Sequence, residues 1–95
     1  MTFEWDENKN IINKKKHGVT FEMALRVFLD EKRIEKFDIE HSTLEEDRIN
    51  IIGRASNVLI LFVVTTDRNG VTRIISARRA EPKEEAEYYE NYDAR

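Results

Sequence analysis

The sequence predicts an α+β fold in which two N-terminal helices and a C-terminal helix pack on a four-stranded antiparallel sheet. Two observations carry this prediction. Apolar residues recur with helical spacing as far as about Asp30, and beyond it they alternate with a period of two. The segments with this alternation are separated by short turns, which favour antiparallel neighbours. Residues 1–95 have the length of a single domain.

The two N-terminal helices are marked by their caps. Asp6 is a favourable N-cap for a helix that runs to about Lys16, and Gly18 follows at a C-cap position. Thr20 caps a second helix that we expect to end near residues 29–30. This second helix presents four apolar side chains at i, i+3, i+4 and i+7, namely Phe21, Ala24, Leu25 and Phe28.

Four segments have the composition and period of β-strands. They are Ile34–Ile39, Arg48–Gly53, Val58–Thr66 and Val71–Arg78. Residues 58–64 are apolar at every position, so we expect a central strand that is covered on both faces, at least partly by helices. The last two strands are joined by Asp67-Arg68-Asn69-Gly70, in which Asn-Gly supplies the positive φ values that a hairpin turn needs.

A C-terminal helix is predicted from Pro82, which suits the first helical position. Its expected inward side chains are Ala86 and Tyr89, with Tyr88 and Tyr92 beside them. Tyr88 or Tyr89 could also stack on a nucleic-acid base, although an inward tyrosine on an amphipathic helix more often belongs to the core.

Composition and missing motifs exclude several classes of protein. The chain has no cysteine, so it has no disulfide framework and no thiolate chemistry. Its longest apolar run, Val58–Val64, is too short to cross a bilayer, and we expect a cytoplasmic protein without membrane contact. There is no glycine-rich phosphate loop and no glycine-flanked serine nucleophile. The spacing of His17 and His41 does not support a metal site, so we expect neither metal nor cofactor.

Charge is unevenly distributed along the chain, although the net charge is only −3. Residues 48–80 contain six arginines and one aspartate, whereas residues 81–95 contain two basic and six acidic residues. Such a distribution permits a basic patch beside an acidic surface. The total charge therefore says little about what the patch binds.

The side chains left for chemistry suit metal-free acid–base reactions on a phosphodiester. His41 lies in a polar loop and could be a general acid or base, or an imidazole that is only bound to a neighbouring carboxylate. Arg73 and Arg78 fall on opposite faces of an ideal strand, and each could bind phosphate or form an ion pair. Lys16 and His17 could contact RNA, or could complement the dipole of the helix that they end.

Motifs along almost the whole chain resemble those of the BrnT family of toxins. In chain order they are Phe3-Glu4-Trp5-Asp6, Lys16-His17-Gly18-Val19, Phe21-Glu22-x-Ala24, Phe28-x-Asp30, His41-Ser42, Glu45-Glu46-Asp47-Arg48, Ile52-Gly53 and Arg73-Ile74-Ile75-Ser76-Ala77-Arg78. The resemblance implies a RelE-like ribonuclease fold and the toxin of a type II toxin–antitoxin pair. It also implies a BrnA-like ribbon-helix-helix antitoxin, with operator DNA bound only through the complex.

The activity that the resemblance implies is cleavage of RNA that lowers translation. For a metal-independent endoribonuclease, we expect His41 as the titrating group, with Arg48 and Arg78 as the catalytic cations. Arg73, Lys16 and His17 are the candidates for further RNA contact. Two alternatives remain open, a non-catalytic module of the same fold that binds the antitoxin and a regulator that binds nucleic acid.

Overall fold

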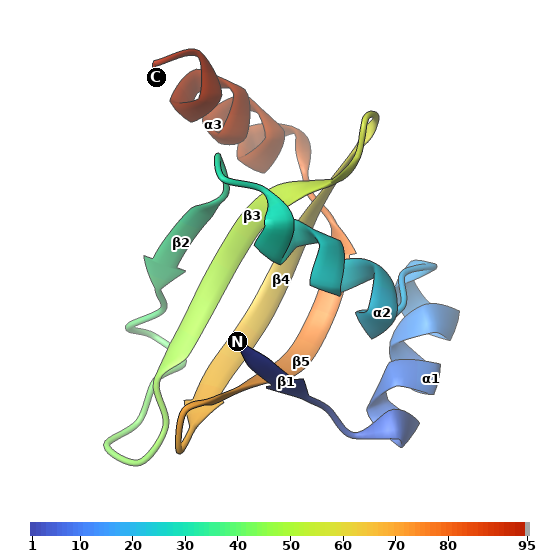
Figure 1. Ribbon diagram of the computed structural model, residues 1–95, viewed down its shortest axis with the longest axis vertical. Helices are drawn as coiled ribbons and strands as arrows, with labels where there is room; N and C mark the ends of the chain where they lie inside the picture. Colours follow the sequence, from blue (N-terminus) through green and yellow to red (C-terminus); the bar gives the residue numbers. More distant parts are fainter. Residues whose placement is uncertain (95) are drawn as a thin grey trace.

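The computed structural model describes residues 1–94 and contains a five-stranded mixed sheet with the order β1-β5-β4-β3-β2 (Figure 1). The elements are β1 (Thr2–Glu4), α1 (Glu7–His17), α2 (Phe21–Ala24), the 3-10 helix η1 (Leu25–Leu29), β2 (Ile34–Phe37), β3 (Arg48–Ser56), β4 (Leu59–Arg68), β5 (Val71–Arg79) and α3 (Pro82–Asp93). Strands β2 to β5 are antiparallel neighbours, as predicted. None of the helices in residues 1–94 has the length and apolar character needed to span a membrane.

The prediction of a purely antiparallel, four-stranded sheet is wrong because of β1. This three-residue strand pairs in parallel with the first residues of β5. Glu4 is the register partner of Arg73, and the two side chains form an ion pair with 2.9 Å between Oε2 and Nη1. A segment this short carries too little alternation to predict a strand, and its partner lies about seventy residues away in the sequence.

The predicted caps of the N-terminal helices are confirmed. The Asp6 side chain accepts hydrogen bonds from backbone N–H groups in the first turn of α1, and Gly18 ends this helix with φ of 71°. The Thr20 side chain accepts from the third backbone N–H of α2. These contacts pair free backbone groups at the helix ends with residues that are adjacent in the sequence. The sequence therefore predicts them correctly.

The second helix differs from its prediction, because α2 makes one turn and the chain continues as η1. Val27 of η1 is fully buried against β3. It lies so close to Gly53 that a Cβ at Gly53 would be 2.5 Å from Cγ1 of Val27. The tighter 3-10 segment and the glycine together allow the helical layer to approach the sheet.

Buried amides, rather than an apolar stripe, attach α1 to the rest of the protein. Asn10 and Asn13 are buried, whereas Ile11 and Ile12 are exposed. Asn13 covers part of the free edge of β5, because its Nδ2 donates to the Ala77 oxygen at 2.7 Å while its Oδ1 accepts from the Ala77 N–H at 3.2 Å. The amide thus pairs with β5 in the manner of a neighbouring strand.

The central position of β4 is confirmed, but only one of its faces is fully covered. On the face under α1, α2 and η1, Leu61 and Val63 are completely buried in the main core. On the other face, α3 covers Ile60, whereas Phe62 and Val64 are only half-buried. The expectation of cover on both faces therefore fails at Phe62 and Val64, which leave part of the sheet open.

A β-bulge brings the arginines of β5 to this same open face. The register between β4 and β5 shifts at Ile75, which has no partner. Arg78 pairs with Phe62 and Arg73 pairs with Thr66, and both partners lie on one face of β4. The expectation that Arg73 and Arg78 point to opposite faces is therefore wrong, because the extra residue resets the alternation between them.

Helix α3 begins at Pro82 and turns Tyr88 inward, as predicted, but the other side chains expected on its inner side are exposed. Tyr88 is completely buried, whereas Ala86, Tyr89 and Tyr92 are exposed. The inward side is otherwise polar, with contacts from Glu84 to Arg78, from Glu87 to Lys36, from Tyr88 to Asp30 and from Asn91 to the Lys32 carbonyl. Arg78, Lys36 and Asp30, which face α3, set this orientation. The spacing of apolar residues in α3 could not predict it.

Candidate functional site

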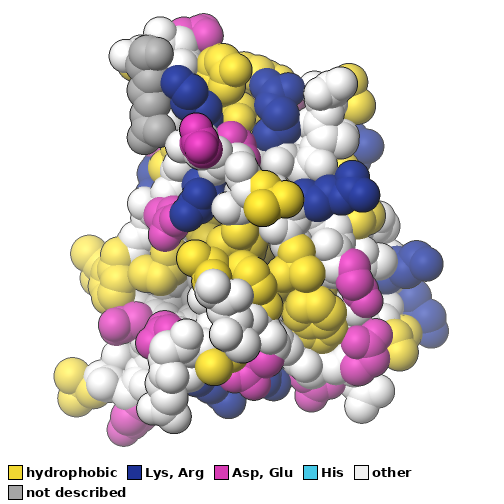
Figure 2. Space-filling model, in the orientation of Figure 1, with side chains coloured by type: hydrophobic (Ala, Val, Ile, Leu, Met, Phe, Trp, Pro, Cys, Tyr) yellow, Lys and Arg dark blue, Asp and Glu magenta, His cyan; other side chains and the backbone are white. Residues whose placement is uncertain are grey.

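An open groove follows the sheet face that α1, α2 and η1 leave uncovered. Its central part is lined by Asp38, Glu40, His41, Arg48, Asn50, Phe62, Val64, Ser76 and Arg78. At one end the lining continues past Arg48 to Arg68 in the β4–β5 hairpin, and at the other it continues past Phe62 to α3. Figure 2 shows the opposite side of the molecule, where hydrophobic side chains gather in the middle of the helix-covered face.

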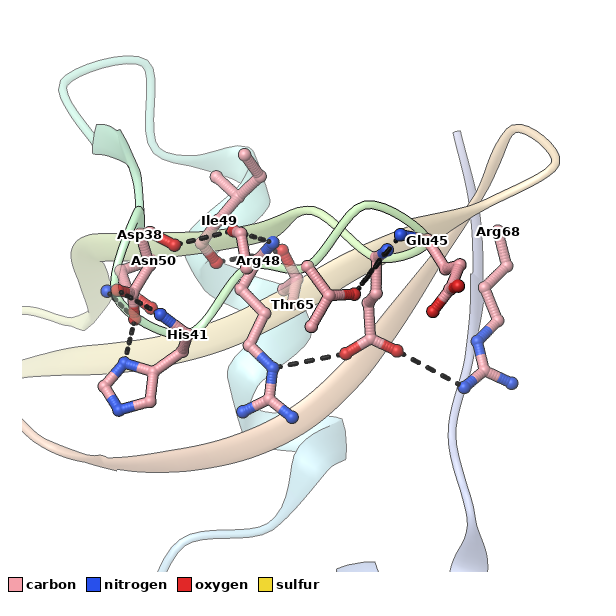
Figure 3. Close-up of polar contacts among 11 residues, drawn as sticks. Asp38, His41, Glu45, Arg48, Ile49, Asn50, Thr65 and Arg68 are labelled. Carbon is pink, nitrogen blue, oxygen red and sulfur yellow. Dashed lines mark hydrogen bonds and ion pairs between the residues drawn. The ribbon is translucent and has the colours of Figure 1, made fainter.

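His41 is oriented by a short chain of hydrogen bonds. Its Nδ1 lies 2.8 Å from Oδ2 of Asp38, and the same oxygen accepts from Nδ2 of Asn50 at 3.1 Å (Figure 3). Because the carboxylate holds Nδ1, Nε2 is the nitrogen left for proton transfer with a ligand. The side chain of His41 is 62% exposed, so a ligand in the groove can reach it.

The Asp38 carboxyl is held in its ionised form. Burial raises the pKa of Asp38, but the hydrogen bonds from Asn50 and His41 together lower it by more. The pKa is therefore below the ordinary value of an aspartate. An ionised carboxylate at this position only accepts hydrogen bonds, and its contact with Nδ1 fixes the orientation of the imidazole ring. Oδ1 of Asn50 is buried and has no hydrogen-bond partner within residues 1–94. The donor contact to Asp38 fixes which way this amide points.

The loop that carries His41 is closed by side chain to backbone hydrogen bonds. Oγ of Ser42 donates to the Asp38 carbonyl at 2.6 Å and accepts from the Arg48 N–H at 2.9 Å. The Asp38 N–H also donates to the Arg48 carbonyl at 2.8 Å. The end of β2 is thereby tied to the start of β3, and this fixes His41 and Arg48 relative to each other.

Arg48 is the cation next to His41, and Figure 3 shows the two side chains projecting side by side. Nε of Arg48 donates to Oε1 of Glu46 at 3.2 Å. The second oxygen of Glu46 lies 3.7 Å from Nη2 of Arg68. A carboxylate therefore bridges two guanidinium groups at this end of the groove.

Arg78 lies further along the groove and is bound to α3. Two of its nitrogens donate to the two oxygens of Glu84 at 2.8 and 2.9 Å, and its guanidinium lies 4.3 Å from the Phe62 ring centroid. The hydrogen bond with Glu84 raises the pKa of Arg78. Burial raises the pKa of Glu84, but the hydrogen bonds from Arg78 and from the Glu81 N–H, together with the nearby positive charges, outweigh burial and lower that pKa. Both groups therefore stay charged, and the charge of Arg78 is largely balanced.

The structure brings three of the six predicted site residues together, because His41, Arg48 and Arg78 line one groove. Arg73 shares the sheet face, but it pairs with Glu4 at the β1 side. Lys16 and His17 end α1 in the helical layer and line none of the three parts of the groove. No group of three or more metal-ligating side chains occurs in the described part of the chain.

Sequence reasoning missed Asp38, Asn50 and Arg68. The one available signal was that Asp38 precedes His41 by three residues at the start of a polar turn, where an aspartate often binds nearby groups. Asn50 and Arg68 contribute only through the pairing of β3 with β4. Their roles depend on strand register, which a single sequence does not reveal.

Comparison with known proteins decides the family. The model of the ribonuclease toxin BrnT of type II toxin–antitoxin systems matches residues 5–84. The chain belongs to the BrnT family. The crystal structure of the Brucella abortus ribonuclease toxin BrnT is similar, with a TM-score of 0.64 and 26% sequence identity over 85% of this chain and 97% of that chain. No curated protein sequence matches this chain. The BrnT match includes the residues that line the central part of the groove and ends in the first turn of α3.

Proposed function

We propose that this BrnT-family chain is an endoribonuclease toxin of RelE-like architecture, which cleaves RNA by acid–base chemistry without a metal ion. One observation carries the proposal. The His41 imidazole, held by Asp38, lies beside the Arg48 guanidinium on an open groove. Cleavage of a phosphodiester needs removal of one proton, supply of another and a fixed cation for the developing charge. His41 and Arg48 provide one proton-transfer group and the cation.

In the proposed reaction, the 2′-oxygen of a ribose attacks the adjacent phosphorus while the bond from phosphorus to the 5′-oxygen breaks. One group removes the proton from the 2′-hydroxyl and another supplies a proton to the departing 5′-oxygen. His41 takes one of these two roles and a water molecule takes the other. Arg48 stabilises the negative charge that develops on the phosphoryl oxygens. The products are a 2′,3′-cyclic phosphate and a 5′-hydroxyl, so no external oxidant or second substrate is needed.

The other cations have less direct support. Arg78 remains a proposed phosphate-binding residue, because it lines the groove, but in the free protein its guanidinium is bound to Glu84. Arg73, Lys16 and His17 lie outside the groove lining, and we propose them only as contacts for RNA that extends beyond it.

A type II toxin implies an antitoxin partner. We propose a BrnA-like ribbon-helix-helix protein in this role, with operator DNA bound through the toxin–antitoxin complex. The cellular effect would be lowered translation in the cytoplasm, caused by loss of RNA. Release of growth arrest on co-expression with such an antitoxin, together with a complex that survives purification, would support this assignment.

The decisive experiment measures cleavage of single-stranded RNA by the purified protein in excess chelator. We expect cleavage with cyclic-phosphate ends, and a loss of about a hundredfold or more in His41→Ala. A folded wild-type protein that binds antitoxin but never cleaves RNA would instead be a non-catalytic module. Salt-dependent binding of DNA by the isolated chain would favour the regulator.

A further inference from the structure

We propose that Arg48 and Arg68 form a second phosphate-binding subsite of the groove, which Glu46 occupies in the free protein. The ligand is a backbone phosphate of a nucleotide that neighbours the scissile bond. The inference rests on the proposed ribonuclease function, because that function supplies the RNA.

Strand register places the two arginines on one face. Arg48 pairs with Thr66, and Arg68 lies two residues beyond Thr66 on β4, so all three side chains share the open face of the sheet. Arg68 also precedes the hairpin turn, where β4 extends past the first residue of β3. The loop that leads into β3 brings Glu46 between the two guanidinium groups.

The position of Glu46 indicates what this place binds. Guanidinium groups recognise carboxylate and phosphate through the same planar set of donors. Glu46 is bound by Nε of Arg48 and by Nη2 of Arg68, so a single anion already spans both residues. Its contact with Arg48 involves Nε alone in the described structure, which leaves the terminal nitrogens of Arg48 available to an incoming phosphate.

Exchange of Glu46 for phosphate is easier than exchange of Glu84 at Arg78. The side chains of Arg48, Glu46 and Arg68 are 34%, 30% and 54% exposed, and exposed ion pairs contribute little to stability. Glu84, in contrast, is only 17% exposed, binds Arg78 through both oxygens, and also accepts from the backbone N–H of Glu81, the residue that precedes α3. An RNA phosphate can therefore open the pair at the hairpin at lower cost than the pair between Arg78 and Glu84.

Glu45 provides a matched control for the test. It lies in the same loop, lines the same part of the groove and carries the same charge, but it forms no ion pair in the described structure. Asp67 is a further acidic residue in this lining, and it is left unchanged. Removing the charge of Glu45 thus measures the general electrostatic effect, whereas removing that of Glu46 also vacates the subsite.

The experiment compares Glu46→Gln with Glu45→Gln in binding a single-stranded RNA whose 2′-hydroxyls are methylated, so that cleavage cannot occur. We expect Glu46→Gln to bind at least about threefold more tightly than Glu45→Gln. Arg68→Ala should weaken binding, cancel the gain from Glu46→Gln, and reduce the slope of log affinity against log salt by about one. Fluorescence anisotropy over a salt series measures all three quantities.

Two results overturn the subsite alone, while wild-type protein still cleaves RNA. The first is an affinity of Glu46→Gln that equals or falls below that of Glu45→Gln, as expected if Glu46 only orients the arginines. The second is unchanged binding in Arg68→Ala. If the wild-type protein neither binds nor cleaves RNA, the proposed function fails as well.

Discussion

Arg73 and Arg78 lie on the same face of the sheet, because the unpaired Ile75 resets the alternation of β5 between them. Each guanidinium then binds a carboxylate from a different end of the chain. Arg73 contacts Glu4 of β1, and Arg78 contacts Glu84 of α3. One extra residue in a strand thus allows β5 to hold both terminal segments against the sheet.

Loss of Arg78 should therefore weaken the fold as well as the groove. We expect Arg78→Ala to lower the free energy of unfolding by about 1–3 kcal/mol, because Glu84 would lose its charged hydrogen-bond partner. Arg79→Ala is the control, since Arg79 is the exposed neighbour at the end of β5. Urea titration followed by circular dichroism measures both. Equal stability of the two variants would show that the ion pair is unimportant for folding.

The same ion pair predicts a loss of stability in acid. The pKa of Glu84 is lowered in the folded protein, so its contribution is fully present above the unfolded value of about 4.3. This contribution disappears as the pH falls from there through the lower, folded pKa. Stability of the wild type and of Glu84→Gln should therefore converge as the pH falls below about 4. A constant difference between them at all pH values would contradict the assignment.

Substitutions around His41 should separate chemistry from folding. His41→Ala should abolish growth arrest with little change in stability, because the side chain is mostly exposed. Asp38→Asn should lower kcat by about tenfold or more while KM for RNA changes little. The reason is that Asp38 acts by positioning the imidazole of His41 and does not itself transfer a proton to or from RNA. Growth assays and chemical unfolding test His41→Ala, and steady-state cleavage kinetics test Asp38→Asn. Wild-type toxicity in folded His41→Ala would remove this histidine from the site.

Packing between η1 and β3 can be tested at Gly53. Gly53→Ala should destabilise the protein by about 1–3 kcal/mol, because the new Cβ would overlap Val27. Adding Val27→Ala should recover part of this loss, as the smaller side chain makes room, although it opens a cavity of its own. A double-mutant cycle by thermal or chemical unfolding measures the coupling. Purely additive effects would argue against direct contact.

The features that the sequence predicted correctly are those set by neighbouring residues. Asp6, Gly18 and Thr20 cap their helices, and Asn69 and Gly70 have the positive φ values of 55° and 84° that the hairpin needs. Each of these depends on a few adjacent groups.

The features that were missed depend on distant partners. Strand β1 forms because it pairs with β5, which is far away in the sequence. The bulge at Ile75 depends on the register between β4 and β5, and the inward orientation of Glu84 depends on its contact with Arg78 of β5. The candidate site shows the same division. The residue types alone predicted His41 and Arg48 as site residues. Only the folded loop shows that the Asp38 carboxylate binds the His41 imidazole.

The amide of Asn13 has a consequence for how this sheet can grow. Strand β1 covers residues 71–73 of β5 and Asn13 covers Ala77, so an added strand would find only the bulged stretch between them and the last two residues of β5. Pairing by strand addition needs a run of free backbone groups in regular alternation. The β5 edge is thus protected against edge-to-edge aggregation, and the sheet can be extended only beside β2.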